Sequence, residues 1–226
     1  MFTEKLAEFV VGTDFDSIPG EGVERAKFSI LDCLGVMLAG SIGPVDKLIM
    51  QFARTMGGEP RSSVIAGGFR TSAPNAALAN GTMGHALDYD DDSDTTYGHP
   101  TVAILPAVLA LGEDRASGRD VLESYILGHE VGARLGSVLI PPHYEKGWHS
   151  TSTLGAITAA AASAKILKLG VEQTRMAFGI AASEASGLRS NFGTMVKPLH
   201  AGSAAQKGVV ATLLAGSGFE ADQDIF

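Results

Sequence analysis

The sequence is poor in cysteine, in aromatic residues and in positive charge. A single cysteine, Cys33, excludes a disulfide framework within the chain and an iron–sulfur cluster held by several of its thiolates. Aromatic residues make up only 7% of the 226 positions, so small residues must fill much of the core. Lysine and arginine number 17 against 25 aspartates and glutamates, for a formal net charge of −8. That balance argues against nucleic acid and against anionic membrane surfaces as partners.

Long apolar runs and familiar cofactor motifs are also missing. No run reaches the roughly 18 apolar residues that span a bilayer. The first helical pattern, MFTEKLAEFVVG, carries two glutamates and a lysine, which is not typical of a signal peptide. We therefore expect no membrane partner and a cytoplasmic protein. The sequence contains no G-x-S-x-G, P-loop, dinucleotide fingerprint, EF-hand pattern or H-E-x-x-H, so nucleotide-dependent chemistry has no support.

Helical periodicity dominates what is present. Apolar residues recur at three- to four-residue spacing, and prolines, glycines and capping residues mark the segment ends. A short strand or hairpin around residues 62–66 is the only β signal. The sequence predicts an all-α, compact multi-helix domain of about nine helices with at most a short β-hairpin. The expected helices are 3–11, 23–39, 44–55, 73–87, 100–111, 117–139, 150–169, 171–185 and 201–214.

One polar stretch stands apart from this apolar background. Residues 80–99 read NGTMGHALDYDDDSDTTYGH and hold five aspartates and two histidines. The stretch starts as the end of an apolar helix, and residues 88–98 then lack any helical period. A polar loop between buried helices presents titratable groups on a rigid scaffold, which favours an active-site loop. The alternatives are a solvated acidic turn and a cation site on Asp91, Asp92 and His99.

Within this stretch two histidines have informative neighbours. His85 and Asp88 are three apart at a helix end, so their side chains share a face and an orienting hydrogen bond is expected behind the site. His99 directly precedes Pro100, which keeps its backbone extended at the mouth of a buried helix. We take His99 as a functional residue for that reason.

Two further irregular stretches, 141–149 and 187–200, hold most of the other unusual polar groups. His149 comes just before a helix, where the amide dipole disfavours the imidazolium, so a neutral His149 could act as a base or a donor. Lys197 lies in the sequence KPLH, and we expect the last helix to begin after His200. The free backbone amides at the start of that helix, together with Lys197, would form a carboxylate-binding site. The alternative is that Lys197 is a surface lysine beside a helix cap.

Four segments, taken together, resemble a known family. NGTMGHALDYDD, GHPT, GWHSTSTLGAITAAAASAKIL and VKPLHAGSAAQKG resemble, in this order, the N-terminal helical domain of the MmgE/PrpD family. The resemblance covers essentially the whole chain and implies one helical domain over residues 1–226, a homodimer, and chemistry on small polycarboxylates without metal or cofactor. Family members are about twice as long, and their α/β lid domain, which supplies further active-site residues, is absent from this chain.

The resemblance also implies roles for individual residues. Asp88 and His99 match active-site positions of the acidic loop, His149 matches the histidine before the alanine-rich helix, and Lys197 matches the lysine of KPLH. These four are the expected catalytic residues, with His85 behind them as an orienting group. The expected substrate-binding residues are Ser93, Thr96, Arg189 and His200.

The reaction expected first is the dehydration of a 2-methylcitrate-like hydroxy acid. Asp88 or a neutral His99 would remove the proton next to a carboxylate, and His149 would protonate the departing hydroxyl group. Lys197 would hold carboxylates and stabilise the developing enediolate. Decarboxylation of cis-aconitate and epimerisation of iminodisuccinate are the alternatives within the family. A non-catalytic helical dimerisation or binding module is the alternative of another class.

Overall fold

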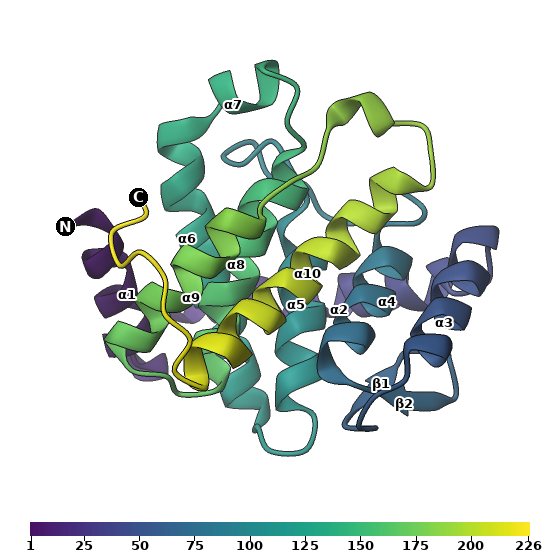
Figure 1. Ribbon diagram of the computed structural model, residues 1–226, viewed down its shortest axis with the longest axis horizontal. Coiled ribbons are helices and arrows are strands. Elements are labelled where there is room, and N and C mark those ends of the chain that lie inside the picture. Colours follow the sequence, from purple (N-terminus) through teal and green to yellow (C-terminus); the bar gives the residue numbers. More distant parts are fainter.

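The fold is built almost entirely from helices. A computed structural model describes residues 1–226, and it contains ten α-helices, two short 3₁₀ turns and one antiparallel hairpin (Figure 1). The expected all-α class with a single short hairpin is confirmed. The helices are α1 (Phe2–Gly12), α2 (Gly20–Gly40), α3 (Pro44–Met56), α4 (Ala73–Gly84), α5 (Pro100–Gly112), α6 (Gly118–Leu139), α7 (Pro142–Glu145), α8 (Ser150–Ile166), α9 (Val171–Glu184) and α10 (Val196–Gly216). The strands are β1 (Ser62–Val64) and β2 (Phe69–Thr71), and the 3₁₀ turns are η1 (Phe15–Ser17) and η2 (Arg189–Asn191).

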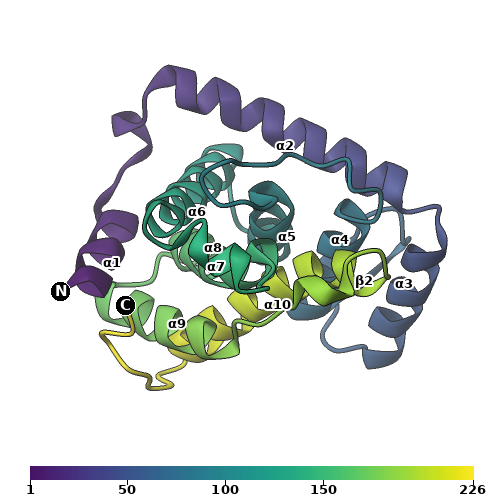
Figure 2. The same ribbon diagram turned by 90° about the horizontal axis from the view of Figure 1, so that it is seen from above.

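Two helices form the interior. Every residue of α5 except Leu109 is buried, and every residue of α8 except Lys165 is buried. α8 packs against α5, α6, α9 and α10, and Figure 2 shows α5 and α8 enclosed by the other helices. Because α8 is rich in alanine, its neighbours approach closely, and small-residue packing compensates for the low aromatic content.

Helices α4 and α10 cross where two glycines meet. A Cβ on Gly81 would lie 2.7 Å from the Cα of Gly202. A Cβ on Gly202 would collide with the carbonyl oxygen of Leu78 and the hydroxyl of Thr82. Only glycine permits this backbone approach. The crossing places the start of α10, which carries Lys197, beside the end of α4, from which the acidic loop departs.

The long helix α2 lies along one edge of the molecule (Figure 2). Several large apolar side chains on it are exposed, among them Phe28 and Leu31. No single helix of the chain combines the length and apolar character needed to cross a membrane, and only α2 with α3, bent by 92°, passes that test as a pair.

Several helices differ from the sequence expectation, and three of these differences bear on the site. α4 ends at Gly84, where His85 leaves helical geometry. α7 is an additional four-residue helix in a stretch expected to be irregular. α10 begins at Val196 rather than after His200, because Pro198 in its first turn has no N–H to leave unpaired. The amides following His200 therefore lie inside the helix, and the carboxylate site expected on them is wrong.

Candidate active site

The three irregular stretches meet at one end of the helical bundle, above α8 in Figure 1. Together they enclose a cavity of about 280 Å³. The lining residues are Asp92, Ser93, Asp94, Tyr97, Gly98 and His99 from the first stretch, Tyr144 and His149 from the second, and Phe192 and Lys197 from the third. Segments that are distant in sequence thus supply two histidines and a lysine to one concave site.

The second and third stretches are held together by their backbones. The N–H of His149 donates to the carbonyl oxygen of Gly187 at 3.0 Å, and the N–H of Arg189 donates to Gly147 at 2.9 Å. This short antiparallel contact keeps the two stretches in register. It places the His149 ring against Phe192, edge to face, with 4.8 Å between the ring centroids.

The acidic loop is attached to α8 beside His99. The N–H of His99 donates to the hydroxyl of Thr151, in the first turn of α8, at 2.9 Å. A Cβ on Gly98 would lie 2.8 Å from the backbone nitrogen of Thr151, so this close approach requires glycine. The N–H of Ser93 donates to the carbonyl oxygen of Gly98 at 3.0 Å and closes the loop into a tight turn. His99 and His149 consequently face the same cavity.

A buried relay of hydroxyl groups anchors the other side of the loop. The carboxylate of Asp91 accepts hydrogen bonds from the N–H of Thr101 at 3.2 Å and from its hydroxyl at 2.5 Å. Since the threonine hydrogen is used in this way, the hydroxyl of Tyr125 donates to Thr101, at 2.6 Å. Burial raises the pKa of Tyr125 to about 12, which keeps that donor protonated. Asp91 therefore fixes the loop to α5 and α6 rather than facing the cavity.

His85 and His99 share Asp90 as a partner. The Nδ1 of His85 lies 2.9 Å from Asp90 Oδ1, and the Nδ1 of His99 lies 3.3 Å from Asp90 Oδ2. Burial favours the neutral acid, but the contacts with the two histidine rings outweigh it and lower the pKa of Asp90 to about 2. Burial likewise disfavours a charged His99, yet the nearby Asp90 carboxylate outweighs it and raises the pKa of His99.

The expected pairing of His85 with Asp88 is wrong, since Asp90 takes that place. Helix α4 has ended by His85, so the three-residue spacing no longer puts the two side chains on one face. Residues 85–87 form a turn, and Asp88 has a positive φ of 52°. The sequence reasoning missed Asp90, because such a turn has no side-chain period that could distinguish the two aspartates.

Asp88 pairs instead with Lys197, whose ammonium group donates to Asp88 Oδ1. Burial alone would raise the pKa of Asp88, but this hydrogen bond and the lysine charge lower it. The Asp88 carboxylate also lies 3.7 Å from the Nε2 of His99. The ammonium group of Lys197 is 5.3 Å from the centre of the Phe192 ring, so aromatic carbon and a carboxylate hold it at the cavity.

His149 is buried and neutral. Burial, together with the His85 ring nearby, lowers the pKa of His149 to about 3. Its Nδ1 lies 3.0 Å from the Nδ1 of His200, a residue of α10 that is itself buried. The pKa of His200 is lowered as well, by burial and by the charge of Lys207.

Three residues expected to bind substrate lie outside the cavity lining. Thr96 is buried against α6: a Cβ added to Gly136 would lie 3.2 Å from the Thr96 methyl carbon. The guanidinium of Arg189 donates to the Tyr144 carbonyl oxygen at 3.0 Å and stacks 3.7 Å above that ring. His200 is turned towards His149. Ser93 is the one expected substrate-binding residue in the lining.

A group of four side chains has the composition of a metal site. Ligand atoms of His85, Asp88, Asp90 and His99 all lie within 4.8 Å of one another. Two histidines with two carboxylates could hold a divalent transition metal. Here each carboxylate already has a partner, since Asp90 binds His85 and Asp88 binds Lys197. A cation would have to displace that lysine.

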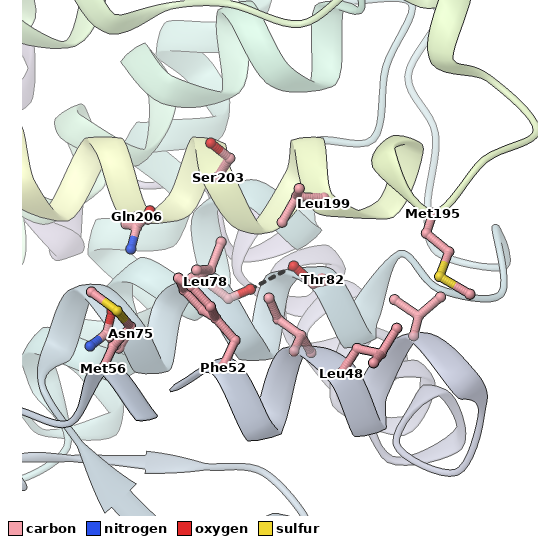
Figure 3. Close-up of a pocket in the computed structure, with 12 residues that line it drawn as sticks. Leu48, Phe52, Met56, Asn75, Leu78, Thr82, Met195, Leu199, Ser203 and Gln206 are labelled. Atoms are coloured by element: carbon pink, nitrogen blue, oxygen red, sulfur yellow. Dashed lines mark hydrogen bonds between the residues drawn. The ribbon is translucent and has the colours of Figure 1, made fainter. Parts of the chain in front are cut away.

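A second cavity lies apart from this site. It is an apolar groove of about 650 Å³ between α3, α4 and α10, drawn in Figure 3. Phe52, Met56 and Leu48 of α3 face Leu78 of α4 and Leu199 of α10 across it. The groove has no acid, base or cation in its lining, so acid–base chemistry belongs to the smaller polar cavity.

The pairing of Asp90 with His99 predicts a pH-dependent stability. We expect Asp90→Asn to lower the pKa of His99, because the substitution removes the main group that offsets burial. The ionised Asp90 carboxylate stabilises the fold above about pH 3.8, and this stabilisation is lost as the pH falls towards 2. Protonated His99 stabilises the fold at low pH, and this stabilisation is lost as the pH rises through the pKa of His99. Removing one partner of such a buried pair costs about 3–5 kcal/mol, and this loss should be larger at pH 5 than at pH 9.

Histidine NMR titration and urea unfolding at both pH values measure these effects. Asp92→Asn is the matched control, because Asp92 lines the same cavity without a histidine partner. An unchanged pKa of His99 in Asp90→Asn would contradict the assignment of Asp90 as its partner.

The sequence is similar to those of known proteins. A family model described as the MmgE/PrpD N-terminal domain matches residues 4–226. Cis-aconitate decarboxylase of Mus musculus is 33% identical over 236 residues, which cover 99% of this chain and 47% of the mouse protein. The enzyme of Aspergillus terreus is 34% identical over 229 residues, covering 97% and 46% of the two chains. That of Homo sapiens is 31% identical over 230 residues, covering 99% and 48%.

The chain spans about half the length of these relatives. The match nevertheless includes all three stretches that form the cavity, because it runs from residue 4 to the last residue described. The resemblance inferred from the four sequence segments is confirmed, and the chain belongs to the MmgE/PrpD family.

Proposed function

We propose that this domain carries the acid–base and carboxylate-binding groups of a lyase that decarboxylates cis-aconitate or a closely similar tricarboxylate. The main observation in its support is that His99, paired with Asp90, shares a cavity with Lys197 and His149. The relatives described above are named cis-aconitate decarboxylases. This reverses the order expected from sequence, in which dehydration came first and decarboxylation was the alternative.

The reaction itself requires one proton and a means of holding anions. In cis-aconitate a –CH₂–COO⁻ group is attached to a carbon of the double bond. When the bond to that carboxylate breaks, CO₂ leaves, and the electron pair of that bond forms a new double bond between the CH₂ carbon and its neighbour. The original double bond breaks at the same time, and its electron pair moves to the former alkene CH carbon, which takes up one proton. No electron is gained or lost overall, so an acid and carboxylate-binding groups suffice for this chemistry.

The residues of the cavity suit these two tasks. His99 is the proposed acid, because its raised pKa favours a proton on the ring. Lys197 is the proposed carboxylate-binding cation. His149, with a pKa of about 3, is neutral and contributes a hydrogen bond rather than a charge. Asp88 is ionised and bound to the lysine, so we assign it to holding Lys197 in place rather than to proton abstraction.

Ion pairs of two aspartates explain how a domain with a net negative charge can bind a substrate with several carboxylates. Asp88 and Asp90 each have a cationic partner, so their charges are locally balanced. Asp92 and Asp94 line the outer part of the acidic loop without such partners. We infer that the substrate carboxylates bind on the side of Lys197 and His99, away from these two.

The test is a product analysis of the full-length protein that carries this domain, supplied in turn with cis-aconitate, citrate and 2-methylcitrate. We expect CO₂ and an unsaturated dicarboxylate from cis-aconitate, and a loss of about 10²–10⁴-fold in kcat for His99→Asn. Water loss from 2-methylcitrate without CO₂ would establish the dehydratase instead. Absence of turnover with all three would favour the non-catalytic module.

A further inference from the structure

His149 and His200 face each other through the same ring nitrogen. Their Nδ1 atoms are 3.0 Å apart, and the residues are only 2% and 8% exposed. A neutral imidazole carries its proton on one nitrogen and accepts at the other. One ring of this pair must therefore donate from Nδ1 while the other accepts at Nδ1. The contact links a cavity histidine on the second stretch to a histidine of α10 that does not line the cavity.

The surroundings of the pair keep it in this arrangement. The ring of His149 is packed against Phe192, with 4.8 Å between centroids. A Cβ on Gly187 would lie 3.6 Å from the Cδ2 of His200, so the third stretch covers that ring. The hydroxyl of Ser152 donates to the His200 carbonyl oxygen at 3.4 Å, joining α8 to α10 beneath the pair. These contacts restrict the rotation of both rings.

Both rings are neutral, because burial lowers the pKa of each. Two neutral rings in contact have two arrangements of their protons, and each assigns a different hydrogen-bonding role to the outer nitrogen of His149. With the proton on His149 Nδ1, its Nε2 can only accept. With the proton on His200 Nδ1, the Nε2 of His149 carries hydrogen and can only donate.

We propose that His200 is a positioning residue that fixes which nitrogen of His149 carries the proton, and so sets the hydrogen bond that His149 offers to the substrate. This inference rests on the proposed function, in which His149 contacts substrate. It replaces the sequence expectation that His200 binds substrate itself. Partners that orient a functional histidine typically change activity by about 10–100-fold when removed.

Three substitutions at position 200 separate positioning from packing. The amide of asparagine places a polar atom near the position of Nδ1, and the amide of glutamine places one near Nε2. Because the contact uses Nδ1, we expect His200→Asn to retain most activity, while His200→Gln and His200→Leu lose about 10–100-fold in kcat with little change in KM. Asparagine and glutamine differ by one methylene, so they serve as a matched pair.

The direct readout is the ¹⁵N NMR spectrum of His149 at pH 7, assigned with His149→Gln. We expect one neutral tautomer in the wild-type protein and in His200→Asn, and averaged shifts of two tautomers in His200→Gln and His200→Leu. If His200→Leu fails to fold, the comparison of His200→Asn with His200→Gln is sufficient to test the proposal.

Unchanged His149 shifts in all three variants, or equal behaviour of the amide pair, would overturn the proposal. A raised KM at constant kcat would also overturn it and would restore a substrate-binding role for His200. The NMR readout needs no substrate, so it distinguishes failure of this inference from failure of the proposed decarboxylation.

Discussion

Lys197→Met in the full-length protein is expected to lower kcat/KM for cis-aconitate by about 10²–10³-fold, the range found when one electrostatic donor is removed from an active site. Its ammonium group is the only lysine or arginine charge in the cavity lining. Without it, the substrate carboxylates lose their charge-assisted hydrogen bond. They would also face Asp88, whose carboxylate would no longer be neutralised by its partner.

The control is the same substitution at Lys168, a side chain 80% exposed that pairs weakly with Asp120 at 3.8 Å. Lys168→Met should leave kcat/KM unchanged, because exposed ion pairs of this kind contribute little. Steady-state kinetics of both variants against cis-aconitate are the measurement. Near-wild-type turnover by both Lys197→Met and His99→Asn would remove the basis for placing the chemistry in this cavity.

The two cavity histidines occupy the same kind of helix position, yet their pKa values are shifted in opposite directions. His99 is the N-cap residue of α5, and His149 is the N-cap residue of α8. Both rings therefore lie at the positive end of a helix, where the imidazolium is disfavoured. Asp90 outweighs this for His99 and raises its pKa, whereas His149 has another imidazole as its partner and its pKa falls to about 3. When the surroundings of two titratable groups shift their pKa values in opposite directions, one group can serve as the acid and the other as the neutral hydrogen-bonding group of a site.

The sequence predicted the helices well because their signal is local. Apolar spacing, proline at 44 and 100, and the Ser117–Asp120 capping box all act within a few residues, and the structure shows that box formed. The three irregular stretches were also visible, since each interrupts helical periodicity. The start of α10 differs from the expectation that the helix begins after His200, because Pro198 is accommodated within its first turn.

Partner choice within the site was less predictable from sequence. Residues in an irregular loop have no fixed period, so the spacing from His85 could not distinguish Asp88 from Asp90. The direction of the Arg189 guanidinium depends on where α7 places Tyr144, across 45 residues of sequence. The contact of His149 with His200 spans 51 residues and depends on the packing of α8 against α10. Such long-range contacts are decided by tertiary packing rather than by local patterns.

Gly202→Ala is expected to lower the free energy of unfolding by about 3 kcal/mol, and so the midpoint of thermal unfolding by about 6–12 °C for a chain of this size. Alanine in place of a helical glycine gains about 1 kcal/mol from helix propensity. Here, however, the added methyl group would collide with the Leu78 carbonyl oxygen and the Thr82 hydroxyl of α4. Overpacking of a core costs about 1–3 kcal/mol and occasionally more. A cost of about 4 kcal/mol, above that range, is expected because a backbone atom cannot rotate aside, and this leaves a net loss of about 3 kcal/mol.

Gly216→Ala, at the far end of the same helix, is the matched control. A Cβ there would meet only the Leu169 side chain at 3.6 Å, an ordinary contact, so its effect should stay within about 1 kcal/mol. Urea and thermal unfolding followed by circular dichroism compare the two variants. Since the crossing at Gly202 sets where Lys197 lies relative to the acidic loop, Gly202→Ala should also reduce activity well below its unfolding temperature. Equal stability of the two variants would show that α4 and α10 separate without cost, and that this crossing does not hold the site together.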